Sequence, residues 1–429
     1  MKCAPACCAD EAGTVTLAIE DLAHGPDAVA RHQGHVIFVR GAAPGDVVRA
    51  RLVGDRDAYA HAEIVHRCVA GPAHREPPCP WVAACGGCPW QHVRYPAQAA
   101  AKERNVRETL ARITGIVPTE LLPILAAPDE LAYRHRIRLH AERGRLGYLR
   151  PRSHQIVEIE HCAIALPELS AVLPAVRRLV RRLATRVETV DLVANGRGGV
   201  VVVLRARRWR PADEPVLAAL VRTESLVTGI RADDRRGSHV VGDSTVVVEG
   251  PPGTPPRRQR AGSFTQVNPT ANRLLIATVL AFAPPAHRVL DLFCGAGNLS
   301  LPLAAAGIVT TGVDRETQAI DDARTAAAGL PGVRFEALAA ERFLAREGTA
   351  GADLVLLDPP RGGAARAVAQ LGRLRPPRIL YVSCNPATLA RDTRTLAAAG
   401  YGVARVQPLD LFPQTPHVET VLEFVLTAA

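Results

Sequence analysis

The chain has 429 residues, more than one hydrophobic core usually organises, so two or three domains are expected. No apolar stretch approaches the roughly 18 residues of a membrane span, and no N-terminal apolar run suggests a signal peptide, which favours a cytoplasmic protein without a membrane partner. The formal net charge of +10 fits a polyanionic partner, because cationic side chains that neutralise phosphates dominate non-specific nucleic-acid affinity.

The basic residues are almost all arginine. Lys2 and Lys102 are the only lysines in the chain. A biased genome explains the preference for arginine, but it does not explain the excess of positive charge.

Residues 1–70 are expected to form a small β-barrel. Alternating or β-branched runs at 14–17, 35–39 and 47–52 are separated by Gly and Pro turns, which is the pattern of short strands. Three cysteines precede them at Cys3, Cys7 and Cys8, and no fourth cysteine lies nearby, so a disordered tail is the favoured interpretation there.

A cysteine loop opens the central region, for which we expect residues 71–255. Cys79, Cys85 and Cys88 follow the spacing C-x5-C-x2-C, which supplies three soft ligands from one loop. Gly86 and Gly87 allow this loop to fold tightly around a metal. A fourth ligand must come from elsewhere, and zinc stays an alternative to an iron-sulfur cluster because four cysteines can hold either.

The rest of the central region mixes a helix with strands. A helix is expected near residues 93–124, packed on the catalytic domain. Residues 133–140 read as a strand with Arg134, Arg136 and Arg138 on one face, which is either a nucleic-acid track or a solvated face. The Pro- and Arg-rich residues 250–260 are typical of a linker or surface loop.

Residues 256–429 show apolar strands that alternate with Ala- and Leu-rich helices, the signature of a doubly wound, largely parallel sheet. The expected strands are 289–293, 309–313, 354–357 and 379–382, with a last strand at 421–426. The fold class is therefore α/β in this part, with a β-barrel and an α+β domain before it.

A glycine turn follows the first of these strands. Gly295 and Gly297 let a ligand approach the backbone, and Asp314 ends the next strand, where its carboxylate can accept the ribose hydroxyls of an adenosine. This combination fits either a nicotinamide enzyme or a methyltransferase that uses S-adenosylmethionine, so the later strands must decide.

Two later strands end in chemically informative loops. Asp358 follows one strand and Cys384 the next, and both leave the sheet edge that carries the glycine turn. A thiolate that adds to C6 of a uracil makes C5 nucleophilic toward a sulfonium methyl group. Glu419, just before the last strand, is the best carboxylate to remove the C5 proton afterwards.

The motifs D-L-F-C-G-A-G-N, L-D-P-P-R-G-G, S-C-N-P-x-T-L-A-R-D and P-Q-T-x-H-V-E-T resemble those of the RNA 5-methyluridine methyltransferase family. The resemblance implies a class I methyltransferase domain with Cys384 as nucleophile and Glu419 as proton acceptor. It also implies a set of residues around S-adenosylmethionine and the base, namely Gln266, Phe293, Asn298, Asp314, Glu341 and Asp358. The chain departs from the family at Thr265, where a second aromatic residue is common, and the segment around Glu341 aligns loosely.

The same resemblance extends to the other domains. The leading strands are similar to a TRAM domain, an RNA-binding barrel, and Cys162 matches the fourth ligand of a [4Fe-4S] cluster formed with Cys79, Cys85 and Cys88. Proteins with both features most resemble enzymes that act on large-subunit ribosomal RNA, so methylation of 23S rRNA is expected. The protein is also expected to be a monomer. Transfer RNA, a cytosine or amino-group methyltransferase, and a non-catalytic RNA-binding or assembly factor remain as alternatives.

Overall fold

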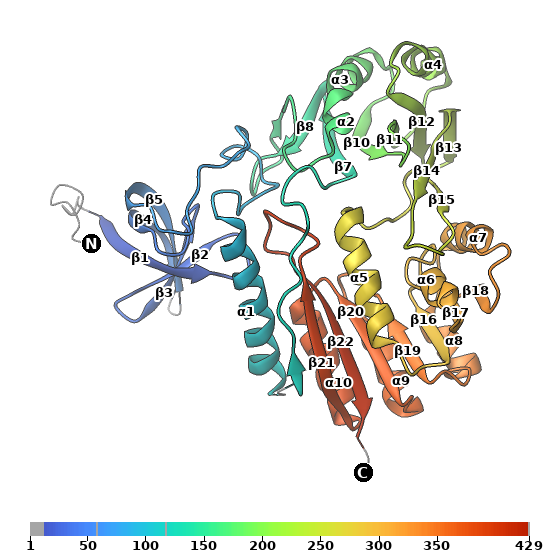
Figure 1. Ribbon diagram of the computed structural model, residues 1–429. Coiled ribbons are helices and arrows are strands. Elements are labelled where there is room, and N and C mark those ends of the chain that lie inside the picture. The colour runs from blue at the N-terminus through green and yellow to red at the C-terminus, as the bar shows by residue number, and fades with distance from the viewer. Residues whose placement is uncertain (1–12, 57–58, 116–117, 428–429) are drawn as a thin grey trace.

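The computed structural model describes residues 13–56, 59–115 and 118–427, which form a barrel and two large sheets with helices packed on them (Figure 1). The cysteines at positions 3, 7 and 8 lie outside these residues. Within the described ranges, no helix combines the length and the apolar character needed to cross a membrane.

The N-terminal strands form the expected barrel. They are β1 (Thr14–Leu22), β2 (Ala28–His32), β3 (His35–Arg40), β4 (Val47–Arg56) and β5 (Tyr59–Val69), closed in the order β1-β2-β3-β5-β4. Alternate side chains such as Leu17 and Ile19 point into the barrel core, as the period of two requires. The buried carboxylate of Asp46 accepts hydrogen bonds from the backbone N–H groups of Ala43 and Gly71 and so fixes the turn before β4.

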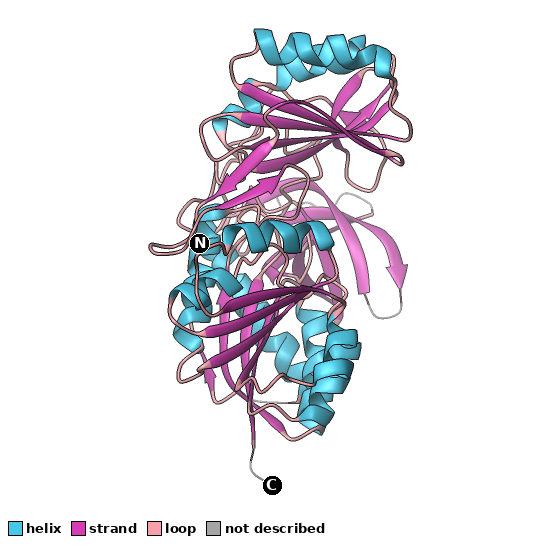
Figure 2. Cartoon of the chain, turned by 90° about the vertical axis from the view of Figure 1, so that its right-hand side faces the viewer, coloured by secondary structure: helices cyan, strands magenta, loops and turns pink. Residues whose placement is uncertain are grey.

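The central sheet has seven strands in the order β13-β12-β11-β10-β7-β8-β9. Their bounds are β7 (Arg136–Glu142), β8 (Arg145–Leu149), β9 (Ile156–Val157), β10 (Val187–Ala194), β11 (Val200–Ala206), β12 (Val227–Asp234) and β13 (Gly237–Gly242). A layer of short helices covers one face (Figure 2), formed by α2 (Pro167–Ala171), α3 (Leu173–Arg182) and α4 (Glu214–Thr223). Val190, Val202 and Ile230 are fully buried between the two layers.

The expected linker at 250–260 is only partly a loop. Its last four residues form β15 (Arg257–Arg260), which pairs with β14 (Thr245–Val248) in a hairpin. Val246 and Ala261 pack against Val201 and Val203 on the second face of the central sheet. The sequence reading missed this strand because three of its four residues are arginines, which hide the burial of alternate positions.

The ion pairs of these arginines correct the expectation of a nucleic-acid track on residues 133–140. Arg134 precedes β7, while Arg136 and Arg138 lie on β7 and both donate to the fully buried carboxylate of Asp191 at 2.6 Å. Arg205 approaches the same carboxylate at 3.4 Å. Two of the three arginines are therefore held in an internal ion-pair network and do not form a free phosphate track.

The C-terminal sheet has eight strands in the order β18-β17-β16-β19-β20-β22-β21-β6. Strands β16 (Arg288–Leu292), β17 (Val309–Asp314), β18 (Val333–Ala337), β19 (Leu354–Leu357) and β20 (Arg378–Ser383) are parallel, whereas β22 (Glu419–Leu426) runs antiparallel between β20 and β21 (Tyr401–Leu409). The short β6 (Glu120–Leu121) adds an edge strand. The helices are α5 (Pro269–Phe282), α6 (Ser300–Ala305), α7 (Thr317–Ala326), α8 (Ala340–Glu347), α9 (Ala365–Leu374) and α10 (Pro386–Ala398).

Helix α1 (Tyr95–Thr114) precedes the central sheet in sequence but packs against α10 and β21 of the C-terminal sheet. It begins with Pro96 in its first turn and ends at Gly115, whose φ of 65° and N–H bond to the carbonyl of Ala111 form a left-handed cap. The helix therefore ties the chain before the central sheet to the face of the C-terminal sheet. It is shorter than the expected helix near residues 93–124, because Gly115 caps it and residues 120–121 form β6.

Candidate active site at the carboxyl edge of the C-terminal sheet

Cys384 directly follows β20, and Glu419 begins β22, the neighbouring strand of the sheet. In the antiparallel ladder of β20 and β22, Val382 pairs with Val421 and Ser383 with Thr420. Continued by one position, this register would set Cys384, directly after β20, opposite Glu419 at the start of β22. Opposite residues of antiparallel strands have Cα atoms about 4.5–5.5 Å apart. Two residues 35 positions apart in the sequence are thus brought together by strand pairing.

The thiol and the carboxyl group influence each other electrostatically. Burial raises the pKa of the Cys384 thiol to about 11, with the charge of Glu419 adding to the shift and the guanidinium of Arg361 opposing it. Burial also raises the pKa of Glu419 well above its ordinary value, and the charge of Asp358 reinforces this effect. Asp358 itself has its pKa raised to about 7 by burial. A cation bound here would favour the ionised form of all three groups.

The glycine turn adopts the geometry of a ligand-binding loop. Phe293, directly after β16, has a φ of 65°, which is uncommon for a residue with a side chain and marks a constrained turn. Gly295 donates its backbone N–H to the carboxylate of Asp314 at 2.9 Å, and the N–H of Asp358 bonds to the carbonyl of Leu292. Phe293, Asp314 and Asp358 therefore lie close together at the carboxyl edge of the sheet.

Asp291 joins this group although the sequence reading did not single it out. It is fully buried on β16, and it accepts a 2.5 Å hydrogen bond from the hydroxyl of Ser300, while its second oxygen has no hydrogen-bond partner among the described residues. Burial raises the pKa of Asp291 to about 8, and the charges of Asp358 and Asp314 contribute. The signal in the sequence is an acid in the middle of a strand that is otherwise apolar.

Asp291→Asn is expected to stabilise the protein without cofactor above pH 4. A carboxyl group whose pKa is raised on folding costs stability once the pH exceeds its unfolded value of about 3.9, and the cost grows up to its folded pKa. Asparagine carries no charge at any pH. The thermal midpoint of the variant should exceed that of the wild type increasingly between about pH 4 and 8. Equal midpoints across this range would contradict the raised pKa of a buried Asp291 whose charge has no compensating cation.

Asn298 is held by two partners on the other side of the turn. Its amide exchanges two hydrogen bonds with the amide of Asn272 on α5, at 2.9 and 3.0 Å. The buried guanidinium of Arg257 donates to the Asn298 side-chain oxygen at 2.8 Å. The sequence reading missed Arg257 because its segment looked like a linker, yet the hairpin delivers this arginine to the glycine turn.

Gln266 lies in a loop that the central sheet holds in place. The imidazole of His135 bonds to the hydroxyl of Thr265 at 2.9 Å and to the carbonyl of Val267 at 3.0 Å. This explains why Thr265 replaces an aromatic residue, since its hydroxyl has a buried partner. Phe264, on the other flank of the loop, is 76% exposed.

Glu341 is a candidate whose side chain has no described contact with the rest of the site. It lies in the first turn of α8, after β18, and its backbone carbonyl accepts a bond from the side chain of Gln370. Among the described contacts, none links the Glu341 carboxylate to the other candidates.

The four candidate metal ligands lie around one cavity. Cys79, Cys85, Cys88 and Cys162 line it together with Tyr148, whose hydroxyl approaches the Cys162 sulfur at 3.7 Å. Burial raises the pKa of Cys85 to about 11 and that of Cys88 to about 12, and the neighbouring thiols add to both shifts. In the part of the chain that the structure describes, no three such side chains are arranged to hold a single metal ion.

The cysteine loop is tightly packed. A side chain at Gly86 would lie 3.3 Å from the carbonyl of Leu149 and from the nitrogen of Pro151. A larger residue at this position would therefore require the loop or residues 149–151 to shift by a few tenths of an ångström.

Comparison with known proteins agrees with this architecture. Residues 255–426 match the family model described as tRNA (Uracil-5-)-methyltransferase, and residues 12–65 match the TRAM domain. A 23S rRNA (uracil(1939)-C(5))-methyltransferase, RlmD of Pectobacterium atrosepticum, is 34% identical over 430 residues, covering 96% of this chain and 94% of the relative. An uncharacterised RNA methyltransferase of Thermosynechococcus vestitus is also 34% identical, over 96% and 98% of the two chains.

Among solved structures, the tRNA (uracil-54, C5)-methyltransferase of Pyrococcus abyssi, in complex with S-adenosyl-L-homocysteine, covers 97% of this chain and 100% of its own. The TM-score is 0.76 at 23% sequence identity, so this likeness establishes the fold. The sheet order, the barrel and the full-length relatives together show that the chain belongs to the RNA uracil-C5 methyltransferase family, with an N-terminal TRAM domain and a class I methyltransferase domain.

Proposed function

We propose that this protein transfers a methyl group from S-adenosylmethionine to C5 of a uridine in 23S rRNA, with Cys384 as nucleophile and Glu419 as base. The observation that supports this most is the pairing of β20 with β22, which brings the end of β20, just before Cys384, beside the start of β22, where Glu419 lies. The rRNA substrate is inferred from the full-length relatives that are named for this reaction.

The carboxylates fit the proposed cofactor. Asp291, Asp314 and Asp358 gather at one strand edge, and the raised pKa of Asp291 and Asp358 means that their charges lack compensation there. S-Adenosylmethionine supplies an electrophilic methyl group and carries positive charge on its sulfonium and amino groups. Asp314, at the end of β17, would accept hydrogen bonds from the ribose hydroxyls.

The proposed reaction uses two groups of this chain, with S-adenosylmethionine as the methyl donor. The Cys384 thiolate forms a bond to C6 of the uracil, which makes C5 an enolate carbon. C5 would then take the methyl group as the methyl–sulfur bond of the donor breaks and S-adenosylhomocysteine leaves. Glu419 then removes the proton from C5, the C6–S bond breaks, and the thiolate is regenerated. Arg361 favours the thiolate, since its guanidinium lowers the pKa that burial raises.

The target nucleotide has to leave its stack for this chemistry. Thiolate addition needs access to C6 from one face of the pyrimidine, and methyl transfer needs C5 open to the methyl donor, so the uridine must be splayed out. Gln266 and the exposed ring of Phe264 lie on a loop fixed by His135, which suits them to contact an extruded base or its neighbour.

The deciding experiment incubates the purified protein with methyl-labelled S-adenosylmethionine and separate pools of 23S rRNA and tRNA, followed by mapping of the labelled nucleotide. Label on a uridine of 23S rRNA is expected. Label confined to tRNA would correct the substrate, and label on a cytidine or on a purine amine would overturn the uridine assignment. Absence of label in every RNA would favour an assembly factor without activity.

We further propose that Cys79, Cys85, Cys88 and Cys162 hold a [4Fe-4S] cluster. All four line one cavity, and the high pKa of Cys85 and Cys88 shows that the site disfavours free thiolates unless a cation compensates them. A cluster provides that charge and occupies more space than a single ion. Its position between the cysteine loop and the central sheet suits a structural role.

Anaerobically purified protein is expected to be brown, and Cys88→Ser should lose both the visible iron-sulfur absorbance and most of the iron. The matched control is Cys68→Ser, because Cys68 lies on β5 of the barrel and does not line the cavity. Colourless wild-type protein with stoichiometric zinc would refute the cluster in favour of a zinc site.

A further inference from the structure

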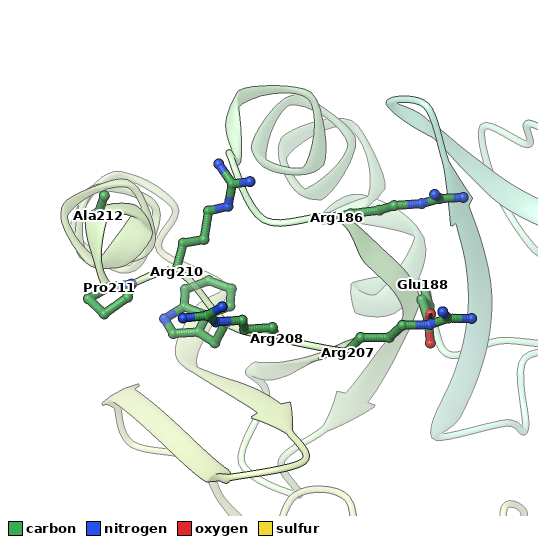
Figure 3. Close-up of a pocket in the computed structure, with 8 residues that line it drawn as sticks. Arg186, Glu188, Arg207, Arg208, Arg210, Pro211 and Ala212 are labelled. Atoms are coloured by element: carbon green, nitrogen blue, oxygen red, sulfur yellow. Dashed lines mark hydrogen bonds and ion pairs between the residues drawn. The ribbon is translucent and has the colours of Figure 1, made fainter.

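The far end of the central sheet carries a concavity of about 520 Å³ with an unusual charge (Figure 3). Its lining holds four arginines and a single acid, and consists of Arg186, Glu188, Arg207, Arg208, Trp209, Arg210, Pro211 and Ala212. Arg186 and Arg207 extend in parallel on one side, and Arg208 and Arg210 lie on the other (Figure 3). We call this surface the arginine concavity.

Most of this charge is available to a ligand. Arg207 pairs with Glu188 at 2.9 Å, on a side chain that is still 82% exposed. Within the described ranges, the side chains of Arg186, Arg208 and Arg210 form no ion pair, and all three residues are exposed. They differ in this from Arg136 and Arg138, whose charges are balanced by Asp191.

The backbone below the arginines is fixed in place. Asp213 accepts hydrogen bonds from the N–H groups of Ala184 and Thr185, and the hydroxyl of Thr185 accepts one from the N–H of Arg210. The N–H of the buried Trp209 bonds to Asp234 at 2.7 Å. The two arginine-bearing segments are thus tied together, so a bound polyanion would not have to order them.

The arginine concavity is remote from the proposed catalytic centre. Strand β10 begins at Val187, beside the arginines, and ends at Ala194, whose N–H bonds to the carbonyl of His135 next to the Gln266 loop. Its length of seven residue steps amounts to about 23 Å at roughly 3.3 Å per residue. A ligand that reaches both places must therefore be long.

We propose that the arginine concavity binds the phosphate backbone of the RNA substrate at a site away from the target uridine. This inference rests on the proposed function for the identity of the polyanion. Trp209 is only 6% exposed, so its ring is not a stacking platform, and the recognition is of backbone charge and not of bases. Such a contact anchors a large structured RNA and leaves the chemistry at Cys384 unchanged.

The test compares Arg208→Gln/Arg210→Gln with Arg288→Gln/Arg373→Gln. The control removes the same charge from exposed arginines at the start of β16 and the end of α9, away from the carboxyl edge of the sheet. Binding of 23S rRNA fragments is measured as a function of salt, and KM and kcat are measured on a series of fragments of decreasing length.

We expect the Arg208/Arg210 variant to lower the slope of log Kd against log salt by about 1.4–1.8, or 0.7–0.9 for each lost phosphate contact. Its KM should rise for long fragments only, with kcat unchanged, and the control should match the wild type. Equal effects in both variants, no change in slope, or an equal KM increase on the shortest methylated fragment would overturn the proposal. Failure of the proposed function is distinguishable, because the wild-type protein would then methylate no fragment.

Discussion

Cys384→Ala is expected to abolish methyl transfer, and Glu419→Gln is expected to reduce turnover by about 10²–10⁴-fold while a covalent protein–RNA adduct accumulates. The reason is the order of the steps. Without the thiol, C5 of the uracil is never activated, whereas without the base the C5 proton stays and the C6–S bond cannot break. Turnover is measured with labelled cofactor, and the adduct as an RNA-bound protein band that persists in denaturant.

Cys68→Ala and Glu423→Gln provide the matched controls. Cys68 lies on β5, outside the C-terminal sheet, and Glu423 lies on β22 but pairs with Arg378 and Arg405. Intact turnover in Cys384→Ala would refute covalent catalysis and point to an amino-group methyltransferase. A Glu419→Gln variant with no adduct and normal release of methylated RNA would show that another group takes the proton.

The strand-end residues could be predicted from sequence because they obey a simple rule. Parallel strands of an α/β sheet end at one edge, so Asp314, Asp358 and Cys384 had to lie near one another once their strands were recognised. This rule does not place Glu419, because β22 is antiparallel and the distance of Glu419 from Cys384 depends on the register of β20 and β22. The family resemblance identified it, and the ladder with β20 supplies the physical reason.

The residues that the sequence did not reveal come from segments far away in the chain. Arg257 reaches Asn298 from a hairpin, and His135, directly before β7 of the central sheet, fixes the Gln266 loop. Neither carries a local motif, because the pattern of a single strand says nothing about which loop its end will touch. Asp291 could have been found, since a fully buried acid in an apolar strand calls for a partner.

Lys102 is the clearest example of a residue whose importance is invisible without the structure. It lies on α1 with no exposed surface, and its ammonium donates to Asp410 at 2.7 Å and to the carbonyl of Phe412 at 3.0 Å. One turn earlier, Gln98 exchanges two hydrogen bonds with Gln414, which has a φ of 70°. Helix α1 therefore shapes the loop that leads to Glu419.

This contact also explains the lysine at this position, in a chain whose only other lysine is Lys2. An ammonium is compact and can satisfy its donors with two or three nearby oxygens, whereas a guanidinium has five donors in a wide planar fork. With no exposed surface at Lys102 or Asp410, water cannot satisfy the remaining donors. The Lys102→Arg variant should therefore lose about 1–3 kcal/mol of stability by overpacking, although the substitution keeps the positive charge.

Lys102→Met should cost about 3–5 kcal/mol, because it leaves the carboxylate of Asp410 buried without its cation, and it should lower kcat by about 10–100-fold through displacement of Glu419. The double variant Lys102→Met/Asp410→Leu separates the two effects. Replacement of both charges by apolar groups is expected to restore the urea midpoint, while kcat stays low because the Phe412 carbonyl has lost its anchor. Full recovery of kcat together with stability would show that Lys102 stabilises the fold without positioning the base.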